Sequence, residues 1–160
     1  MTDPLAPQGV VFRPVSPKLA TVRVISELIV FIPFITASLI GVIMLTKWLW
    51  IATAALTALL IWSVWIVVRQ VRAMGFALNE DEFLIRKGIM FKHLTLIPYG
   101  RIQYVEVSEG PIARMFNVAE LRLHTASPVT NAILNGVPSG EAARLRDMLV
   151  ERGSAELAGL

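Results

Sequence analysis

Two long apolar stretches lie in tandem near the start of this chain, and they limit the possible folds more than any other feature. They cover residues 24–45 and 48–68 and are separated by Thr46 and Lys47. A helix rises about 1.5 Å per residue, so each stretch is long enough to cross a hydrocarbon layer of roughly 30 Å. Glu27, near the start of the first stretch, is the one charged residue within them. So short a connection requires antiparallel packing, and the sequence therefore predicts a membrane-spanning helical hairpin.

Basic residues are distributed unevenly around the hairpin, and their distribution predicts its orientation. The turn between the stretches holds one cation, Lys47. The two outer flanks together hold Arg13, Lys18, Arg23, Arg69 and Arg72. Lys and Arg close to the ends of membrane helices tend to remain in the cytoplasm. We therefore expect a multi-pass protein of the plasma (inner) membrane with both termini in the cytoplasm.

Tryptophans mark the expected ends of the second membrane helix. Trp48 and Trp50 lie at the outer turn, and Trp62 and Trp65 lie towards the inner end. Tryptophan prefers the boundary between lipid and water, so these positions support the expected depth. The first stretch is too long and begins too far from Met1 for a cleaved signal peptide.

Small residues recur at a spacing of four in both stretches, as Ala37 and Gly41 and as Ala54 and Ala58. This spacing allows helices to approach closely, so we expect contact between the two spans, with a seam between two copies as the alternative. Pro33 predicts a local kink. No ionisable residue lies deep in either stretch, which counts against a pump, an ion channel or a proton-coupled carrier. The hairpin is expected to act as an anchor.

The chain becomes more polar after residue 69, and this change divides it into parts. We expect a cytoplasmic tail at 1–22, the hairpin at 23–69, a cytoplasmic domain at 70–153 and a second tail at 154–160. Four prolines predict that the first tail is irregular; they are Pro4, Pro7, Pro14 and Pro17. The alternative is that residues 10–13 dock onto the membrane or onto the domain. The chain has no cysteine, which excludes disulfides and thiolate metal sites.

Short apolar runs alternate with turn residues after residue 72, and this pattern predicts antiparallel strands. The clearest alternation lies in 118–126, where Ala119, Leu121, Leu123 and Thr125 face one way and Glu120, Arg122 and His124 face the other. Other strands are expected at 73–78, 82–87, 89–98, 101–108 and 131–137, with one helical turn at 111–116. Ser139 is expected to cap an amphipathic helix that Gly153 ends. The fold class is therefore a membrane α-helical hairpin followed by a mainly-β (α+β) domain.

Three segments of this domain resemble the bacterial pleckstrin-homology-like (PH-like) family of membrane proteins, formerly a domain of unknown function. These segments are 97–106, 110–119 and 121–126. Asn117 departs from the family pattern because glycine is usual there, although asparagine also tolerates left-handed backbone angles. The matching positions are Pro98, Arg101, Ile102, Gln103, Gly110, Arg114, Phe116, Thr125 and Ala126.

The resemblance covers residues 20–152 and implies a PH-like barrel of two antiparallel sheets with a C-terminal helix at one end. This expectation agrees with the strand pattern read from the residues themselves. Members of the family are described as membrane proteins without an assigned function. One fold hosts many functions, so the resemblance does not by itself confer phosphoinositide binding.

Residues that could carry catalysis or bind metal are scattered along the sequence. His93 and His124 have no ligand partner on their own strand faces and are expected to be solvent-facing rather than metal ligands. Glycines 100 and 110 are isolated turn residues, so no phosphate-binding loop is expected. The hydroxyl groups of Ser108, Thr125 and Ser127 lack an evident base. We expect no enzyme activity, no cofactor and no metal.

A group of basic residues early in the domain has two interpretations that the sequence leaves open. Arg86, Lys87, Lys92 and Arg101 could orient the domain against anionic lipid headgroups, or they could be ordinary charges on strand faces. Nucleic-acid binding is not expected because the group is small and lacks interleaved aromatic residues.

The favoured function is a cytoplasmic-facing binding or scaffolding module at the plasma membrane. Expected partners are membrane lipids and other membrane proteins, among them members of the same family. The alternative is an accessory subunit of a membrane transport or envelope-stress complex, with the hairpin packed into a larger helical bundle.

Overall fold

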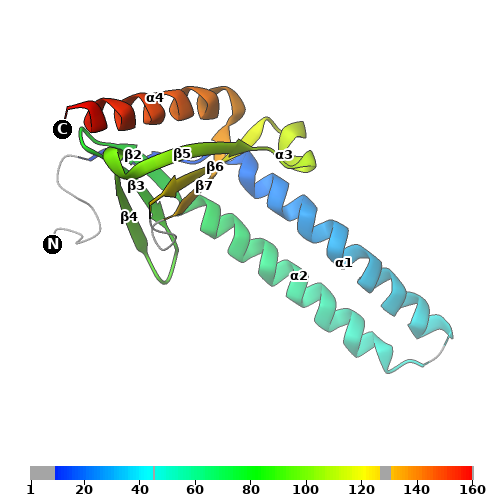
Figure 1. The fold of residues 1–160 in the computed structure, drawn as a ribbon. Coiled ribbons are helices and arrows are strands. Elements are labelled where there is room, and N and C mark those ends of the chain that lie inside the picture. The colour runs from blue at the N-terminus through cyan, green and yellow to red at the C-terminus, as the bar shows by residue number, and fades with distance from the viewer. Residues whose placement is uncertain (1–9, 45, 127–130, 160) are drawn as a thin grey trace.

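The computed structural model describes residues 10–44, 46–126 and 131–159 (Figure 1). Pro4, Pro7 and Ser127 lie outside these residues. The elements of the described residues, in chain order, are β1 (Arg13–Pro14), α1 (Lys18–Met44), α2 (Leu49–Arg72), β2 (Gly75–Leu78), β3 (Glu82–Lys87), β4 (His93–Pro98), the 3-10 helix η1 (Tyr99–Arg101), β5 (Ile102–Ser108), α3 (Pro111–Met115), β6 (Val118–Thr125), β7 (Ala132–Pro138) and α4 (Ser139–Ala158).

Helices α1 and α2 run side by side and extend from one side of the sheets (Figure 1). Among the described residues, these two helices are long and apolar enough to cross a membrane. Each extends beyond its apolar stretch at the end nearest the domain, to Lys18 and to Arg72. Pro33 lies inside α1, which remains one continuous helix. The expected helical hairpin is confirmed.

Polar and small residues hold the two helices together. Ser38 Oγ and Thr53 Oγ1 share a hydrogen bond of 2.8 Å, and Ser63 Oγ donates to Glu27 Oε2 at 2.9 Å. Gly41 is buried, as the expected contact between the spans requires. The other small residues of the pattern, Ala37, Ala54 and Ala58, are exposed.

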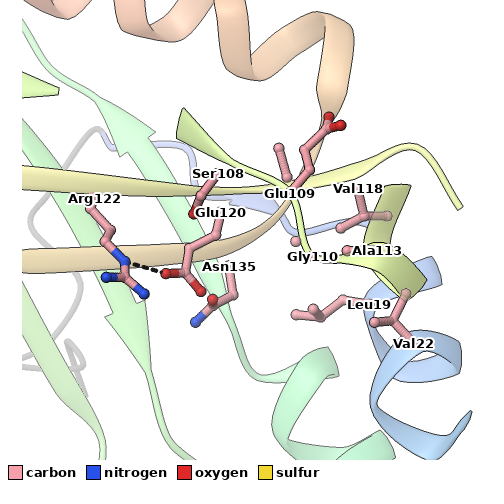
Figure 2. Close-up of a pocket in the computed structure, with 12 residues that line it drawn as sticks. Leu19, Val22, Ser108, Glu109, Gly110, Ala113, Val118, Glu120, Arg122 and Asn135 are labelled. Atoms are coloured by element: carbon pink, nitrogen blue, oxygen red, sulfur yellow. Dashed lines mark hydrogen bonds and ion pairs between the residues drawn. The ribbon is translucent and has the colours of Figure 1, made fainter. Parts of the chain in front are cut away.

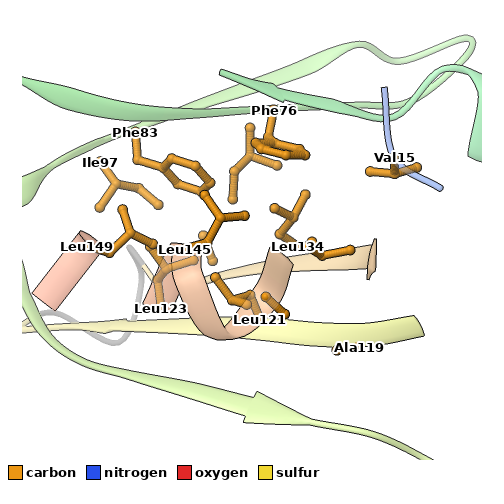
Figure 3. Close-up of a cluster of buried hydrophobic side chains, with 14 of the residues drawn as sticks. Val15, Phe76, Phe83, Ile97, Ala119, Leu121, Leu123, Leu134, Leu145 and Leu149 are labelled. Atoms are coloured by element: carbon orange, nitrogen blue, oxygen red, sulfur yellow. The ribbon is translucent and has the colours of Figure 1, made fainter. Parts of the chain in front are cut away.

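The strands form two antiparallel sheets that pack face to face. Among the described residues, the strand orders are β1-β2-β3-β4 and β5-β6-β7. Side chains from both sheets and from α4 meet in one core, which includes Phe76, Phe83, Ile97, Leu121, Leu123, Leu134, Leu145 and Leu149 (Figure 3). The fold class is confirmed, although the two sheets remain separate ladders and do not close into a continuous barrel.

The helix pair is inserted between β1 and β2, so the segment before it belongs to the domain. Arg13 and Pro14 pair with Phe76 and Gly75 of β2. Val15 is buried in the core, and the Ser16 N–H donates to the Gly136 carbonyl at 2.7 Å. Of the residues 10–13 for which docking was the alternative, Arg13 pairs with β2 and Phe12 lies under the Arg86 guanidinium, whereas Val11 is exposed. The structure thus supports docking onto the domain for the end of this segment, and the contact continues to Ser16.

Two sequence-based expectations about α4 are wrong. Gly153 does not end the helix, which continues to Ala158 through most of the segment expected to be a tail. Ser139 does not cap it, because Pro138 holds the N-cap position and the buried Ser139 Oγ has no hydrogen-bond partner in the described part of the chain.

Turn residues explain the remaining boundaries. Gly88 adopts a positive φ of 102° in the turn that follows β3, and β4 begins at His93 rather than at residue 89. Pro111 occupies the first turn of α3 as expected. Asn117 adopts φ 54°, the left-handed conformation expected where the family pattern has glycine.

Candidate functional site

A cavity of about 470 Å³, named the polar cavity after the side chains of its floor, lies on the outer face of the second sheet, where α1 enters the domain (Figure 2). The alternation of β6 points Glu120 and Arg122 to this face, away from the core. The strand register then adds a residue from each side, because Ser108 of β5 and Asn135 of β7 both lie opposite Glu120. The cavity floor therefore collects polar side chains from three adjacent strands.

The walls of the cavity are mostly apolar and come from the helices. Leu19 and Val22 of α1 form one wall, and Ala113 of α3 forms another. Gly110, the N-cap of α3, lies at the rim beside Glu109. A ligand bound here would therefore contact strand side chains, the short helix and the first turns of a membrane helix together.

The charges on the cavity floor are largely paired with each other. Arg122 Nε donates to Glu120 Oε1 at 2.5 Å, and this bond raises the pKa of the guanidinium further above its ordinary value. Arg122 is half-exposed, so the pair contributes little to stability. A floor with a satisfied ion pair is suited to hydrogen bonding with a polar ligand or a polypeptide segment rather than to attracting a highly charged one.

Lys87 links the two sheets beside this cavity. Its Nζ donates to the carbonyl oxygen of Ile133 in β7, although Lys87 itself ends β3. Burial lowers the pKa of the Lys87 ammonium, Arg23 of α1 lowers it further, and Glu120 opposes the shift. The lysine therefore acts within the domain as a bridge between strands.

The structure separates the four basic residues that the sequence groups as lipid contacts. Arg86 stacks over the ring of Phe12 at 4.7 Å, while Lys92 is exposed just before β4. With Lys87, these residues flank the turn between β3 and β4. Arg101 lies in η1, beyond the other end of β4, so it does not share a surface with the turn.

His124 has a partner that sequence spacing does not reveal. Its ring stacks on Tyr104 with centroids 4.2 Å apart, and its Nε2 lies 3.5 Å from Glu106 Oε2. Both neighbours come from β5, because Tyr104 lies opposite His124 in the register. Within the described residues, no group of three or more His, Cys, Asp or Glu side chains could hold a metal ion.

The residues that carry the family resemblance shape turns and core rather than one site. Pro98, Arg101 and Gly110 lie at the ends of β4, η1 and α3, while Ile102 and Thr125 are buried where β5 begins and β6 ends. Phe116 packs against the core. Five of the matching positions are exposed, namely Arg101, Gln103, Gly110, Arg114 and Ala126.

The sequence pattern does not reveal that one cavity floor is formed by Ser108, Glu120, Arg122 and Asn135. The alternation in 118–126 already placed Glu120 and Arg122 on one face. The contributions of β5 and β7 depend on the pairing register, which is irregular at Ala119–Glu120 and so cannot be counted from sequence.

Comparison with known proteins agrees with this architecture. UPF0699 transmembrane protein YdbS of Bacillus subtilis (strain 168) is 31% identical over 74 residues, which cover 46% of this chain and 45% of that protein. UPF0699 transmembrane protein YdbT of the same organism is 27% identical over 100 residues, covering 61% of this chain and 20% of that protein. The matches thus span less than half the length of these relatives.

No solved structure matches the chain significantly. The two apolar helices and the transmembrane relatives make this a membrane protein. The family model described as "Bacterial PH domain" matches residues 19–152, which include nearly all of both apolar helices, strands β2 to β7 and most of α4. This chain belongs to the bacterial PH domain family.

Proposed function

We propose that this protein is a binding module that crosses the plasma membrane twice and holds its PH-like domain at the cytoplasmic face. Its partner is another membrane protein, with members of the same family as the first candidates. The observation that carries the proposal is the shared core of the helix pair and the domain. Val15 and Leu19 before and within α1, and Val71 at the end of α2, are buried with the strand residues.

A shared core fixes the domain relative to the membrane helices. Two residues, Ala73 and Met74, separate α2 from β2, and Met74 itself packs against the core. At the other join, a Cβ at Gly136 would come within 2.8 Å of Leu19 Cδ2. A domain held this closely presents its surfaces at a constant height and angle above the lipid, which suits a protein that must meet another protein in the same membrane.

The polar cavity is the surface that we assign to the partner. Its walls include Leu19 and Val22, so a partner bound there would contact both the domain and the start of α1. The paired charges of Glu120 and Arg122 favour recognition of a polar polypeptide segment over catalysis.

The orientation of the protein can be tested directly because the chain contains no cysteine. Lys47→Cys places a single thiol near the far turn of the hairpin, and Val150→Cys places one on the exposed face of α4. A membrane-impermeant maleimide should label the Lys47→Cys protein in intact cells. It should label the Val150→Cys protein only after the cells are permeabilised. The reverse pattern would overturn the cytoplasmic placement of the domain.

The partner surface can be tested with a photo-crosslinking residue in the full-length protein. We expect a crosslinker at Ser108, in the cavity, to capture a membrane protein from native membranes, while one at exposed Arg144 of α4 captures none. No capture at Ser108, or equal capture at both positions, would contradict the assignment of this surface.

The second candidate function, an accessory subunit of a membrane transport or envelope-stress complex, is favoured by the exposed Ala54 and Ala58 of α2. Small residues on a free helix face would let a further helix approach closely. If a crosslinker at Ala58 captures a membrane protein and one at Ser108 captures none, this candidate is favoured over the binding module proposed above. Ala52 is exposed on another face of α2 and serves as the matched control position.

A further inference from the structure

A second groove, different in character from the polar cavity, lies between α2 and the turn that joins β3 to β4. Its volume is about 550 Å³. The turn points to the side of the domain from which the helix pair extends (Figure 1). The main apolar walls are Trp62, Trp65 and Ile66 of α2 and Ile89, Met90 and Phe91 of the turn.

The turn presents large apolar side chains away from the core. Met90 is 87% exposed and Phe91 is 76% exposed. The turn is tight, because a Cβ at Gly88 would clash with the carbonyl oxygen of Phe91. Moving a Met or Phe side chain from water into an apolar environment is favourable. These two side chains therefore favour an apolar environment that the domain itself does not provide.

The neighbouring helix indicates which environment that is. Trp62 and Trp65 are near the inner end of a helix that is apolar and long enough to cross a membrane. Tryptophan at such a position prefers the boundary between hydrocarbon and headgroups. Arg69 follows one turn later and its guanidinium stacks over the Trp65 ring at 4.7 Å. The turn residues line the same groove as these side chains, so they lie at the same boundary.

The groove is therefore complementary to an amphipathic, anionic molecule. Its walls towards the membrane are apolar, while Arg69 lies in its lining and exposed Lys92 follows Phe91 in the turn. Basic side chains at this depth are attracted to the headgroups of an anionic leaflet. A phospholipid matches this pattern, with an acyl chain along Trp62 and Ile66 and a phosphate near Arg69.

We propose that Met90 and Phe91 insert into the lipid boundary as a further contact with the membrane, and that the groove beside them binds an anionic phospholipid. This inference deepens the proposed function and depends on it for the identity of the leaflet, which is the cytoplasmic one. The depth of the turn depends only on its position beside α2. The bound lipid and the inserted turn would hold the domain against the bilayer on the side opposite to α4 (Figure 1).

The first test measures depth in the full-length protein, reconstituted in vesicles of phosphatidylethanolamine and phosphatidylglycerol. A nitroxide is attached to Phe91→Cys, and to Val150→Cys on α4 as the control. Oxygen concentrates in the bilayer and a nickel chelate in water, so their effects on spin relaxation report the depth of each label. We expect label 91 to be accessible to oxygen and protected from nickel, and label 150 to show the opposite. Label 91 behaving like label 150 would overturn the insertion.

The second test measures the bound lipid. Purified, delipidated protein in detergent is mixed with short-chain phosphatidylglycerol or phosphatidylcholine, and lipid-bound species are counted by native mass spectrometry. We expect wild-type protein to prefer phosphatidylglycerol. The Met90→Ser/Phe91→Ser variant should retain several-fold less of either lipid, and Arg69→Gln should lose the preference. Val150→Ser is the matched control and should bind like wild type.

Equal retention by the Met90→Ser/Phe91→Ser variant and wild type, with an unchanged unfolding temperature, would overturn the groove assignment. So would efficient crosslinking of Phe91→Cys to a second copy of the purified protein, because the groove would then be covered by protein. Both tests are independent of orientation in the cell. Failure of the maleimide labelling pattern with success here would therefore reject the proposed function and retain the groove.

Discussion

Gly153 of α4 lies directly against the backbone of Tyr99, so that a Cβ at position 153 would stand 3.0 Å from the Tyr99 carbonyl oxygen. Arg152, the preceding residue, reinforces the same contact. Its Nη1 donates to Tyr99 Oη at 3.1 Å and to the Asn79 carbonyl at 2.9 Å. Tyr99 is buried and its hydroxyl also donates to the Asn79 carbonyl at 2.9 Å. The last turns of α4 are thus joined to η1, the link between the two sheets.

This contact predicts that Gly153→Val destabilises the protein by about 2–3 kcal/mol, because the backbone oxygen of Tyr99 cannot rotate away from an added side chain. The matched control is Gly140→Val in the same helix, where a Cβ would meet nothing within 4 Å. Thermal unfolding in detergent should show a lower transition temperature for the first variant and a nearly unchanged one for the second. Equal shifts in the two variants would mean that the close approach at Gly153 does not limit stability.

The same residue illustrates what a sequence can predict about this fold. A glycine after an apolar stripe is typical of a helix end, and the pattern alone does not distinguish it from a glycine required by a neighbouring backbone. The partner, Tyr99, is 54 residues earlier in the chain, and its position depends on how α4 crosses the sheets. Periodicity predicted the helix, the hairpin and the strand faces well because each is a local pattern of polar and apolar residues.

The candidate site was less predictable for a related reason. Glu120 and Arg122 were placed on one face by alternation within a single strand. Their grouping with Asn135 depends on a register that shifts at Ala119–Glu120, and a shift of one residue reverses the face of every later side chain. The lipid groove similarly depends on a contact between α2 and a turn about twenty residues later, which no local pattern specifies.

The shared core predicts that Leu19→Ala loosens the join between helix pair and domain. Leu19 is 7% exposed and packs with Val15 and Gly136. Removing its side chain should cost about 2–4 kcal/mol of unfolding free energy, as for other buried leucines. The distance distribution between spin labels at Lys47→Cys and Val150→Cys should also broaden. Leu39→Ala, the same substitution at a 42% exposed position of α1, should leave the distribution narrow.

A distribution that stays narrow in the Leu19→Ala variant would contradict the fixed join, even if stability falls. The two measurements are therefore needed together, since lower stability alone would follow from any cavity in the core.

Lys87 predicts a specific dependence of stability on pH. Burial first, and then Arg23, lower the pKa of this ammonium in the folded protein below its ordinary 10.5, while Glu120 opposes the shift. Between the lowered pKa and 10.5, the unfolded chain binds a proton that the folded protein has released, so the free energy of unfolding rises with pH in that window. Below the lowered pKa both states are protonated and the full destabilisation is present.

Lys87→Met should remove this rise, so the difference in unfolding free energy between wild type and variant should grow in favour of wild type as the pH increases towards 10.5. Glu120→Gln should move the rise to lower pH, because it removes the carboxylate that favours the charged lysine. Chemical unfolding in detergent across alkaline pH provides the measurement. Parallel curves for wild type and Lys87→Met would show that Lys87 titrates with an unchanged pKa.

The hydrogen bond between Ser38 and Thr53 predicts a coupling between the two membrane helices. Their hydroxyl oxygens lie 2.8 Å apart, and Thr53 Oγ1 also donates to the Leu49 carbonyl of its own helix. Hydrogen bonds between helices in membranes contribute about 0.6 kcal/mol on average. A double-mutant cycle consists of Ser38→Ala, Thr53→Ala and the double variant. Its coupling energy should be near that value in unfolding experiments in detergent.

The control cycle pairs Thr36→Ala with Thr53→Ala, because Thr36 bonds back to Ile32 of its own helix. The coupling energy of this control should be close to zero. A Ser38–Thr53 coupling no larger than this control would mean that packing around buried Gly41, rather than the polar pair, holds this part of the hairpin together.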